Sequence, residues 1–161
     1  MIRPATATDA AAIAEIYNHY VLHTVVTFEE ETVSTEEMRT RIVETQEASY
    51  PWLVYEKDGQ VEGYAYASKW RARRSYRYCV ETTVYLDQKR LGGGRGSQLY
   101  GRMLPMLKSA GFHVAVGVIA LPNQGSVALH EKFGFTQAAH YQQVGWKFEQ
   151  WIDVGSWQLL L

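Results

Sequence analysis

Residues 81–104 read ETTVYLDQKRLGGGRGSQLYGRML: a β-branched and aromatic run, a glycine-rich loop, and then large apolar residues at helical spacing. The apolar stripe consists of Leu99, Tyr100, Met103, Leu104 and Leu107. In a strand–loop–helix unit, successive backbone N–H groups and the positive end of the helix dipole converge on one point. The stretch therefore predicts an anion-binding loop, and a phosphate group is its natural ligand.

Two nucleotide-binding motifs do not fit this loop. A P-loop requires Lys and then Ser or Thr after its second glycine, and no Lys follows Gly96. A dinucleotide-binding loop requires the spacing G-x-G-x-x-G and an acidic residue on the next strand, but VAVGVIAL at 114–121 contains no acid. A plain glycine turn between a strand and a helix remains the alternative.

The flanking sequence predicts one mixed α/β domain covering residues 1–161. We expect helices from about Asp9 to His23 with Thr8 as the cap, from Ser34 to Tyr50 at the furthest, from Ser97 to Gly111, and from Asn123 or Ser126 to Gly134. We expect strands at residues 2–5, 76–87, 112–121, 135–144 and 146–161, and a hairpin within 52–70 that turns at Asp58-Gly59.

Composition excludes several function classes. The chain has 16 Lys and Arg against 17 Asp and Glu, so its overall field is weak and we expect neither nucleic acid nor a membrane as partner. Cys79 is the only cysteine, which excludes an internal disulfide and fits the cytoplasm. No run approaches the roughly 18 apolar residues of a membrane span. His19 and His23 have metal-ligand spacing without an accompanying carboxylate pattern, so we expect packing or surface roles and no metal.

Longer stretches resemble a known family. Residues 81–104, together with VIALPNQGSVALHEKFGF at 118–135, resemble motifs A and B of the GCN5-related N-acetyltransferases (GNAT). The runs IRPATATDAAAIAEIYNHYV, YPWLVYEKDGQVEGYAYASKWRARRSY and DVGSWQL are similar to phosphinothricin N-acetyltransferases and the related methionine sulfoximine and sulfone acetyltransferases. The resemblance implies a mixed, mostly antiparallel sheet with a splayed central strand pair, flanked by about four helices, in a homodimer with the substrate cleft near the interface.

The resemblance also implies a cofactor site for acetyl-CoA. The family loop R/Q-x-x-G-x-G/A holds the pyrophosphate, and the strand before it bonds the pantetheine arm through its backbone. The residues that this assigns to the cofactor are Thr83, Val84, Tyr85, Leu86, Arg90, Gly92, Gly94, Arg95, Gly96, Ser97 and Asn123. Leu91 stands where the family has Arg or Gln, and we expect Arg90 or Arg95 to replace that contact. Asn123 is equally well explained as a helix cap.

Acetyl transfer to an amine needs a base, because a free amine is mostly protonated near neutral pH. Glu81 is the only acid within YCVETTVY, its neighbours can desolvate it, and it matches the family's catalytic glutamate. The alternative is an outward-facing strand carboxylate. His130 matches the position that serves the leaving thiolate, as proton donor or relay; the alternative is a packing histidine.

The segment SKWRARRSYRY at 68–78 concentrates positive charge in a nearly neutral protein. An arginine fork can receive a carboxylate or phosphinate in bidentate fashion, although a solvated cationic loop is the alternative. The resemblance assigns the substrate to Arg71 and Arg73, with Phe28, Trp70 and Tyr76 as walls. The prediction is an N-acetyltransferase of a small amino acid such as phosphinothricin, methionine sulfoximine or methionine sulfone. The alternatives are acetylation of a protein N-terminus or lysine, and a non-catalytic acyl-CoA binding module.

Overall fold

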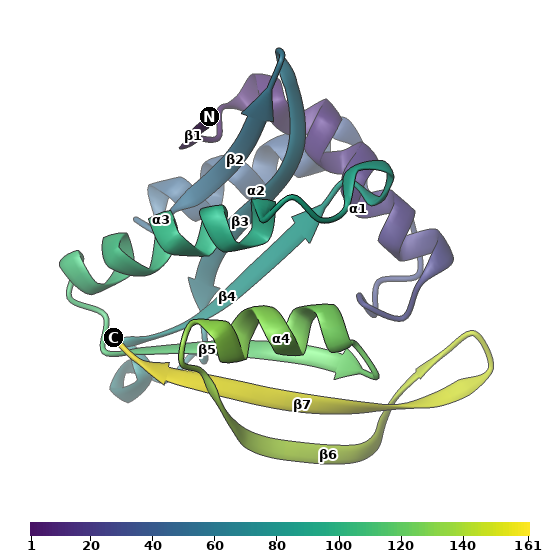
Figure 1. The fold of residues 1–161 in the computed structure, drawn as a ribbon, viewed down its shortest axis with the longest axis vertical. Helices are drawn as coiled ribbons and strands as arrows, with labels where there is room; N and C mark the ends of the chain where they lie inside the picture. The colour runs from purple at the N-terminus through teal and green to yellow at the C-terminus, as the bar shows by residue number, and fades with distance from the viewer.

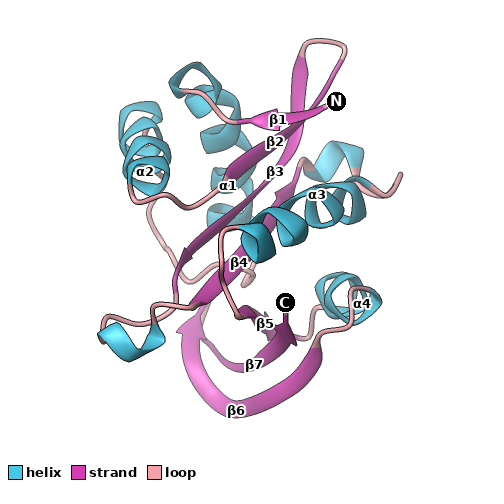
Figure 2. Cartoon of the chain, turned by 90° about the vertical axis from the view of Figure 1, so that its left-hand side faces the viewer, coloured by secondary structure: helices cyan, strands magenta, loops and turns pink.

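The computed structural model describes residues 1–161 and contains a seven-stranded sheet in the order β1-β2-β3-β4-β5-β7-β6. The strands are β1 (Ile2–Pro4), β2 (Trp52–Lys57), β3 (Gln60–Lys69), β4 (Cys79–Leu86), β5 (Val114–Leu121), β6 (Thr136–Lys147) and β7 (Gln150–Leu160). The helices are α1 (Ala10–His23), α2 (Thr35–Glu47), α3 (Arg95–Ser109) and α4 (Gln124–Lys132). Helices α1 and α2 cover one face of the sheet and α3 and α4 the other, as Figure 2 shows.

Strands β4 and β5 are the only parallel neighbours in the sheet, and they separate soon after they meet. Their register pairs Cys79 with Val114, Val80 with Ala115 and Glu81 with Val116, and no backbone pair follows. Beyond this point the two strands diverge (Figure 1). The Thr82 hydroxyl still donates to the Val116 carbonyl, at 3.4 Å. The prediction of a splayed central pair in a mostly antiparallel sheet is thereby confirmed.

Several predicted boundaries are confirmed, because they depend on capping and turn residues that act within a few positions. Ser34 caps α2 by accepting a hydrogen bond from the Glu37 amide at 3.1 Å, and the helix ends before Pro51. Asp58 and Gly59 turn the β2–β3 hairpin with φ values of 51° and 73°, as the Asp-Gly signal predicts. Helix α4 begins after Asn123, whose side chain accepts from the Ser126 amide at 3.1 Å.

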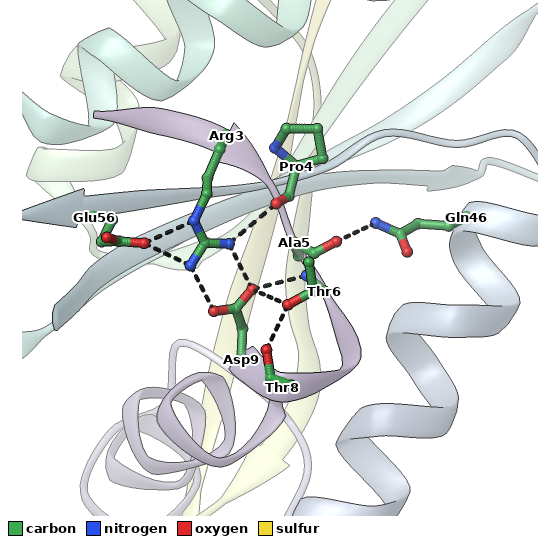
Figure 3. Close-up of polar contacts among 8 residues, drawn as sticks. All are labelled: Arg3, Pro4, Ala5, Thr6, Thr8, Asp9, Gln46 and Glu56. Atoms are coloured by element: carbon green, nitrogen blue, oxygen red, sulfur yellow. Dashed lines mark hydrogen bonds and ion pairs between the residues drawn. The ribbon is translucent and has the colours of Figure 1, made fainter. Parts of the chain in front are cut away.

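The predicted first helix, from about Asp9 to His23, agrees with α1 within one residue, but its predicted cap, Thr8, is wrong. A 3-10 turn at Ala7–Asp9, capped by Thr6 rather than Thr8, precedes α1. The reason is the Asp9 carboxylate, which accepts from the Thr6 amide at 2.7 Å and forms a bidentate pair with Arg3 (Figure 3). Arg3 also pairs with Glu56 of β2 at 2.6 Å. The side-chain bond to Arg3 lowers the pKa of Asp9, so the turn is fixed by charge as well as by capping.

Two apolar cores lie on the two faces of the sheet. The core under α1 and α2 includes Ile13, Tyr17, Val21, Met38, Ile42, Tyr64 and Tyr85. The core under α3 includes Val80, Leu99, Tyr100, Met103, Leu107, Ile119 and Phe135. Tyr85 and Val80 are both on β4 and face opposite cores, because successive side chains of a strand alternate between faces. Strand β4 therefore contributes side chains to the cores on both faces of the sheet.

Candidate active site

The glycine loop has the geometry of an anion site. Gly92, Gly93 and Gly94 have φ values of 83°, 63° and 70°, a region that side-chain-bearing residues rarely adopt. Gly94 caps α3, and the first backbone bond of the helix is donated by Gln98 to the Gly94 carbonyl at 2.9 Å. The amides of residues 95–97 consequently have no partner within the helix, and they point out of its positive end.

Gly96, the fourth glycine of the loop, is assigned to the cofactor by the resemblance, but its missing side chain serves a contact between two helices. A Cβ on Gly96 would stand 3.2 Å from Leu129 Cδ2, so Gly96 allows α3 and α4 to approach closely. A Cβ on Gly94 would meet nothing within 4 Å, and its positive φ is what requires glycine there. The loop thus leaves backbone amides free at the start of α3, which suits a phosphate group. Its last glycine allows α3 to pack closely on α4.

Glu62 of β3 fixes this loop, and the sequence reasoning missed it. Its side chain is 1% exposed and pairs with two arginines that flank the glycines: Arg90, and Arg95 at 2.5 Å. Arg95 also donates to the Gly92 carbonyl at 3.0 Å. These bonds, above all that from Arg95, lower the pKa of Glu62. The available signal was a lone acid within the otherwise apolar run VEGYAYA at 61–67.

A cleft of about 590 Å³ opens beside the loop and brings most of the predicted cofactor residues together. It is lined by Val84, Tyr85, Leu86, Gly92, Gly94, Arg95, Gly96, Ser97 and Asn123 from that set. Thr83 lines a smaller cavity of about 40 Å³ that continues into the split between β4 and β5. Arg90 lines neither, because its guanidinium is bound to Glu62 and Gln60.

Two further residues of this cleft were not predicted. Leu91 lines it, where the family has a polar residue. Lys132 of α4 donates to the Ser97 hydroxyl at 3.0 Å and so places a cation beside the start of α3. An ammonium and the free amides of a helix N-terminus both favour negative charge. Lys132 is therefore a candidate for the contact that we expected from Arg90 or Arg95, and it lies on a different helix, far from the loop in the sequence.

Glu81 is the last residue of β4 with a partner on β5, so its carboxylate lies where the strands separate. By strand alternation it shares a face with Tyr85, which packs in the core under α1 and α2. Burial raises the pKa of Glu81, and no ion pair compensates it. Glu81 lines neither cavity itself, but a partly buried carboxylate with a raised pKa at the point where two strands part has the properties of a general base.

His130 belongs to α4, which lies on the face of the sheet opposite to the one that Glu81 faces. It is 3% exposed, and its Nδ1 is 2.7 Å from the Ser126 carbonyl oxygen, to which it can only donate. In the neutral ring Nε2 is then the acceptor, and it lies 3.0 Å from the Tyr100 hydroxyl. Burial lowers the pKa of His130, which favours this neutral form. His130 lines the small cavity with Thr83 and Asn123.

The predicted substrate residues are brought together only in part. The Arg71 guanidinium lies 5.3 Å from the Trp70 ring and 5.6 Å from the Tyr76 ring, so these three form one exposed cluster. Arg73 is exposed and begins the adjacent 3-10 turn, Arg74–Tyr76. Phe28 lies elsewhere, in the segment after α1, where its ring packs against the backbone of β6. The cluster has no ion pair of its own, so its charge is available to an anion.

No group of three or more His, Cys, Asp and Glu side chains is arranged to hold a metal ion. His19 and His23 lie on α1 with ring centroids 5.0 Å apart. None of the helices has the length and apolar character that a membrane span requires.

The split sheet, the glycine cradle before α3 and the partly buried carboxylate at the split fit an acyltransferase. Residues 2–155 match the acetyltransferase (GNAT) domain family, and the chain belongs to this family. It is 43% identical over 98% of its length to the phosphinothricin N-acetyltransferase of Streptomyces viridochromogenes, 85% of which is covered. It is 41% identical over 99% of its length to the L-methionine sulfoximine/L-methionine sulfone acetyltransferase of Salmonella typhimurium, 94% of which is covered.

A solved structure agrees with these relatives. An acetyltransferase from Salmonella typhimurium, solved with its cofactor acetyl-CoA, superposes with a TM-score of 0.97 at 41% identity over 100% of this chain and 93% of that one. The predictions of the family, of the fold and of an N-acetyltransferase enzyme are confirmed. The predicted cofactor, acetyl-CoA, is the one bound in that neighbour.

Proposed function

We propose that this protein acetylates the α-amino group of a small amino acid of the phosphinothricin and methionine sulfoximine type, with acetyl-CoA as the acetyl donor. The observation that carries the proposal is the position of Glu81. Its carboxylate, with a pKa raised by burial, lies where β4 and β5 part, on the strand that lines the cofactor cleft. The names of the relatives support the substrate class.

The cleft fits the proposed cofactor. Acetyl-CoA supplies an activated acetyl thioester at the end of a long arm that carries a pyrophosphate. The unpartnered amides of Arg95, Gly96 and Ser97 would hold the pyrophosphate, and Lys132 adds a positive charge beside them. Beyond Glu81 the β4 backbone lacks a β5 partner, so Thr83 and its neighbours can bond to the amides of the arm.

Glu81 and His130 would handle the protons of the reaction from opposite faces of the sheet. The amine must lose a proton before its nitrogen can form a bond to carbon, and Glu81 would accept it. The departing sulfur must gain a proton when its bond to carbon breaks. Because Nδ1 of His130 is bound to Ser126, we propose that His130, which lines the small cavity, takes a proton from solvent at Nε2 and passes it to the sulfur, while the proton on Glu81 is released to solvent. His130 is then a relay, and Tyr100 orients its ring.

The arginine cluster would select the acceptor by charge. Arg71, held between Trp70 and Tyr76, can bind the carboxylate or the tetrahedral acid group of an amino acid. Arg73 adds positive charge next to it. Polyamines and aminoglycosides would meet like charge here, so the cluster favours an anionic or zwitterionic acceptor over a polycation.

We also propose that the protein forms a homodimer and is located in the cytoplasm. The β6–β7 hairpin exposes Tyr141, Val144, Trp146, Phe148 and Trp151. The rings of Trp146 and Trp151 are 4.7 Å apart, and an exposed apolar patch of this kind supports a homodimer. The free thiol of Cys79 supports the cytoplasm as the compartment. We also propose that residues 1–161 form a single N-acetyltransferase domain, since the family match spans 2–155.

Release of free thiol from acetyl-CoA, followed for the purified protein with different amines, tests the proposal. Phosphinothricin, methionine sulfoximine and methionine sulfone should be turned over, whereas spermidine and a peptide with a free N-terminus should not. Turnover of the peptide alone would replace the amino-acid substrate with a protein N-terminus. Acetyl-CoA binding by calorimetry without turnover of any amine would leave only a binding module.

A further inference from the structure

A buried lysine joins two parts of the chain that are far apart in the sequence. The side chain of Lys147, near the end of β6, is 2% exposed. Its Nζ donates to the carbonyl oxygens of Val21 at 2.8 Å, Thr27 at 2.8 Å and Glu29 at 2.9 Å. All three N–H bonds of the ammonium are therefore used by the segment that leaves α1.

The Lys147 contact connects the two halves of the fold that the split sheet separates. Val21 and Thr27 belong to the N-terminal half of the fold, and Lys147 belongs to the C-terminal hairpin. In the sheet these halves are joined by only three residue pairs of β4 and β5, after which the strands diverge. Lys147 bridges the halves on the side of the sheet where α1 lies, which is also the side that Glu81 faces.

The segment that Lys147 holds, residues 24–29, contributes to the opening. Val26 lines both the cofactor cleft and the small cavity in the split. The Phe28 ring lies on Gly145, where an added Cβ would stand 2.3 Å from it. Within the segment, the Thr27 hydroxyl bonds the Tyr17 hydroxyl at 2.8 Å. The positions of Val26 and Phe28 relative to Glu81 therefore depend on where Lys147 fixes their backbone.

Packing alone does not explain a lysine at this position. Removing an ammonium from water is costly, and burial lowers the pKa of Lys147. No carboxylate forms an ion pair with it; the contacts are three backbone carbonyls. A methionine would fill a similar space without burying a charge, but it would leave those carbonyls without their donor. The ammonium thus acts as a tie between backbone segments.

We propose that Lys147 is a positioning residue that sets the opening on the acceptor side and with it the affinity for the amino-acid substrate. This inference rests on the proposed function, because it assigns a place to the acceptor. Lys147 touches no predicted cofactor residue in the hydrogen bonds that hold it. The tie positions Phe28, which the resemblance assigns to the acceptor, and leaves the glycine loop untouched, although Val26 borders the cofactor cleft. Its loss should therefore affect acceptor binding far more than acetyl-CoA binding.

The test compares Lys147→Met with Lys57→Met, a matched control that removes an exposed lysine of β2. For Lys147→Met we expect the KM for the amino-acid acceptor to rise about tenfold or more, while the Kd for acetyl-CoA stays within about twofold. Amide hydrogen exchange of residues 21–30 should accelerate in Lys147→Met and not in Lys57→Met. Unchanged exchange, or equal losses toward both substrates, would overturn the proposal.

A second variant keeps the proposal testable if Lys147→Met does not fold. Gly145→Ala leaves the ammonium in place but pushes the Phe28 ring aside, so it should raise the acceptor KM and not the acetyl-CoA Kd. An acceptor KM equal to that of the wild type would overturn the role of this segment. If the wild type acetylates no amino acid, the proposed function fails; faster exchange of residues 21–30 in Lys147→Met would still establish the tie.

Discussion

Nε2 of His130 lies 3.0 Å from the hydroxyl of Tyr100, and this contact orients the ring. Because Nδ1 donates to Ser126, Nε2 is the nitrogen that can accept a proton. The pair should therefore act as a unit. We expect Tyr100→Phe and His130→Ala each to lower kcat about tenfold to a thousandfold, and the double variant to lose no more than the worse single one. Steady-state kinetics of the four proteins measures this, and losses that multiply would separate the two roles.

Glu81 should control the pH dependence from the acid side. Burial raises its pKa, so the carboxylate becomes a base only above the ordinary glutamate value of about 4.3. The rate should rise through that shifted pKa, and Glu81→Gln should remove this limb and lower kcat about 10²- to 10⁴-fold. Calorimetry should give an unchanged Kd for acetyl-CoA. Wild-type turnover in Glu81→Gln would exclude it as the base.

Glu81 should also weaken the fold at neutral pH, because its pKa is raised by burial. An acid whose pKa is raised in the folded state favours folding below its unfolded pKa, and this contribution is lost as pH rises through the folded pKa. At neutral pH the ionised Glu81 therefore weakens the fold, and Glu81→Gln should unfold at a higher temperature than the wild type. At pH 4 the difference should shrink. Equal melting temperatures at both pH values would contradict the burial of this carboxylate.

Glu62 should affect acetyl-CoA affinity without touching acetyl-CoA. In Glu62→Gln the charge that holds Arg90 and Arg95 is lost, so the glycine loop loses its support and the KM for acetyl-CoA should rise about tenfold with kcat little changed. The pKa of Glu62 is lowered, so its contribution to stability is present above about pH 4.3 and is lost as pH falls through the folded value. The melting temperatures of Glu62→Gln and wild type should converge in acid. An unaltered acetyl-CoA KM would show that the loop holds itself.

The contrast between Glu62 and Gly94 shows what the sequence can predict here. Turns, caps and the anion loop are encoded within a few residues, as with Ser34, Asp58-Gly59 and Gly94, so local chemistry predicts them. Glu62 and Lys147 act on partners that only the fold brings near, and no spacing rule marks them beyond an isolated charge among apolar neighbours. The sequence suggests Thr8 as the cap because the spacing of Arg3 and Asp9 does not mark their ion pair. The family resemblance implies the split of β4 from β5, which periodicity alone does not predict.

Arg71 should set the charge preference of the acceptor site. Arg71→Lys keeps the positive charge but loses the planar fork held between Trp70 and Tyr76. Arg71→Met loses both. We expect the acceptor KM to rise in the order wild type, Lys, Met, by about tenfold or more at the second step, with the acetyl-CoA KM constant. Arg102→Met, on the exposed face of α3, serves as a control for net charge. Equal effects of Arg71→Met and Arg102→Met would assign the cluster to solvated surface charge.

Gly117 should be required for the placement of His130. A Cβ on Gly117 would stand 2.2 Å from His130 Nε2 and 2.5 Å from Cδ2. The ring has little room to move, because it packs edge-on against Tyr100 and Phe135 at centroid distances of 5.2 Å and 5.0 Å. Gly117→Ala should therefore destabilise the fold by about 1–3 kcal/mol, as overpacking does. It should also lower kcat as far as His130→Ala, because the bond to Tyr100 breaks.

Gly101→Ala is the matched control for this substitution. Gly101 lies on the exposed side of α3, where an added Cβ would be 4.0 Å from the Phe133 ring. Replacing an exposed glycine inside a helix should stabilise the fold by about 0.5–1 kcal/mol and leave kcat unchanged. Thermal unfolding and initial rates of the two alanine variants measure both quantities. If Gly117→Ala kept wild-type kcat, a shift of the His130 ring would be harmless, and neither its bond to Tyr100 nor its place at the split would matter to the reaction.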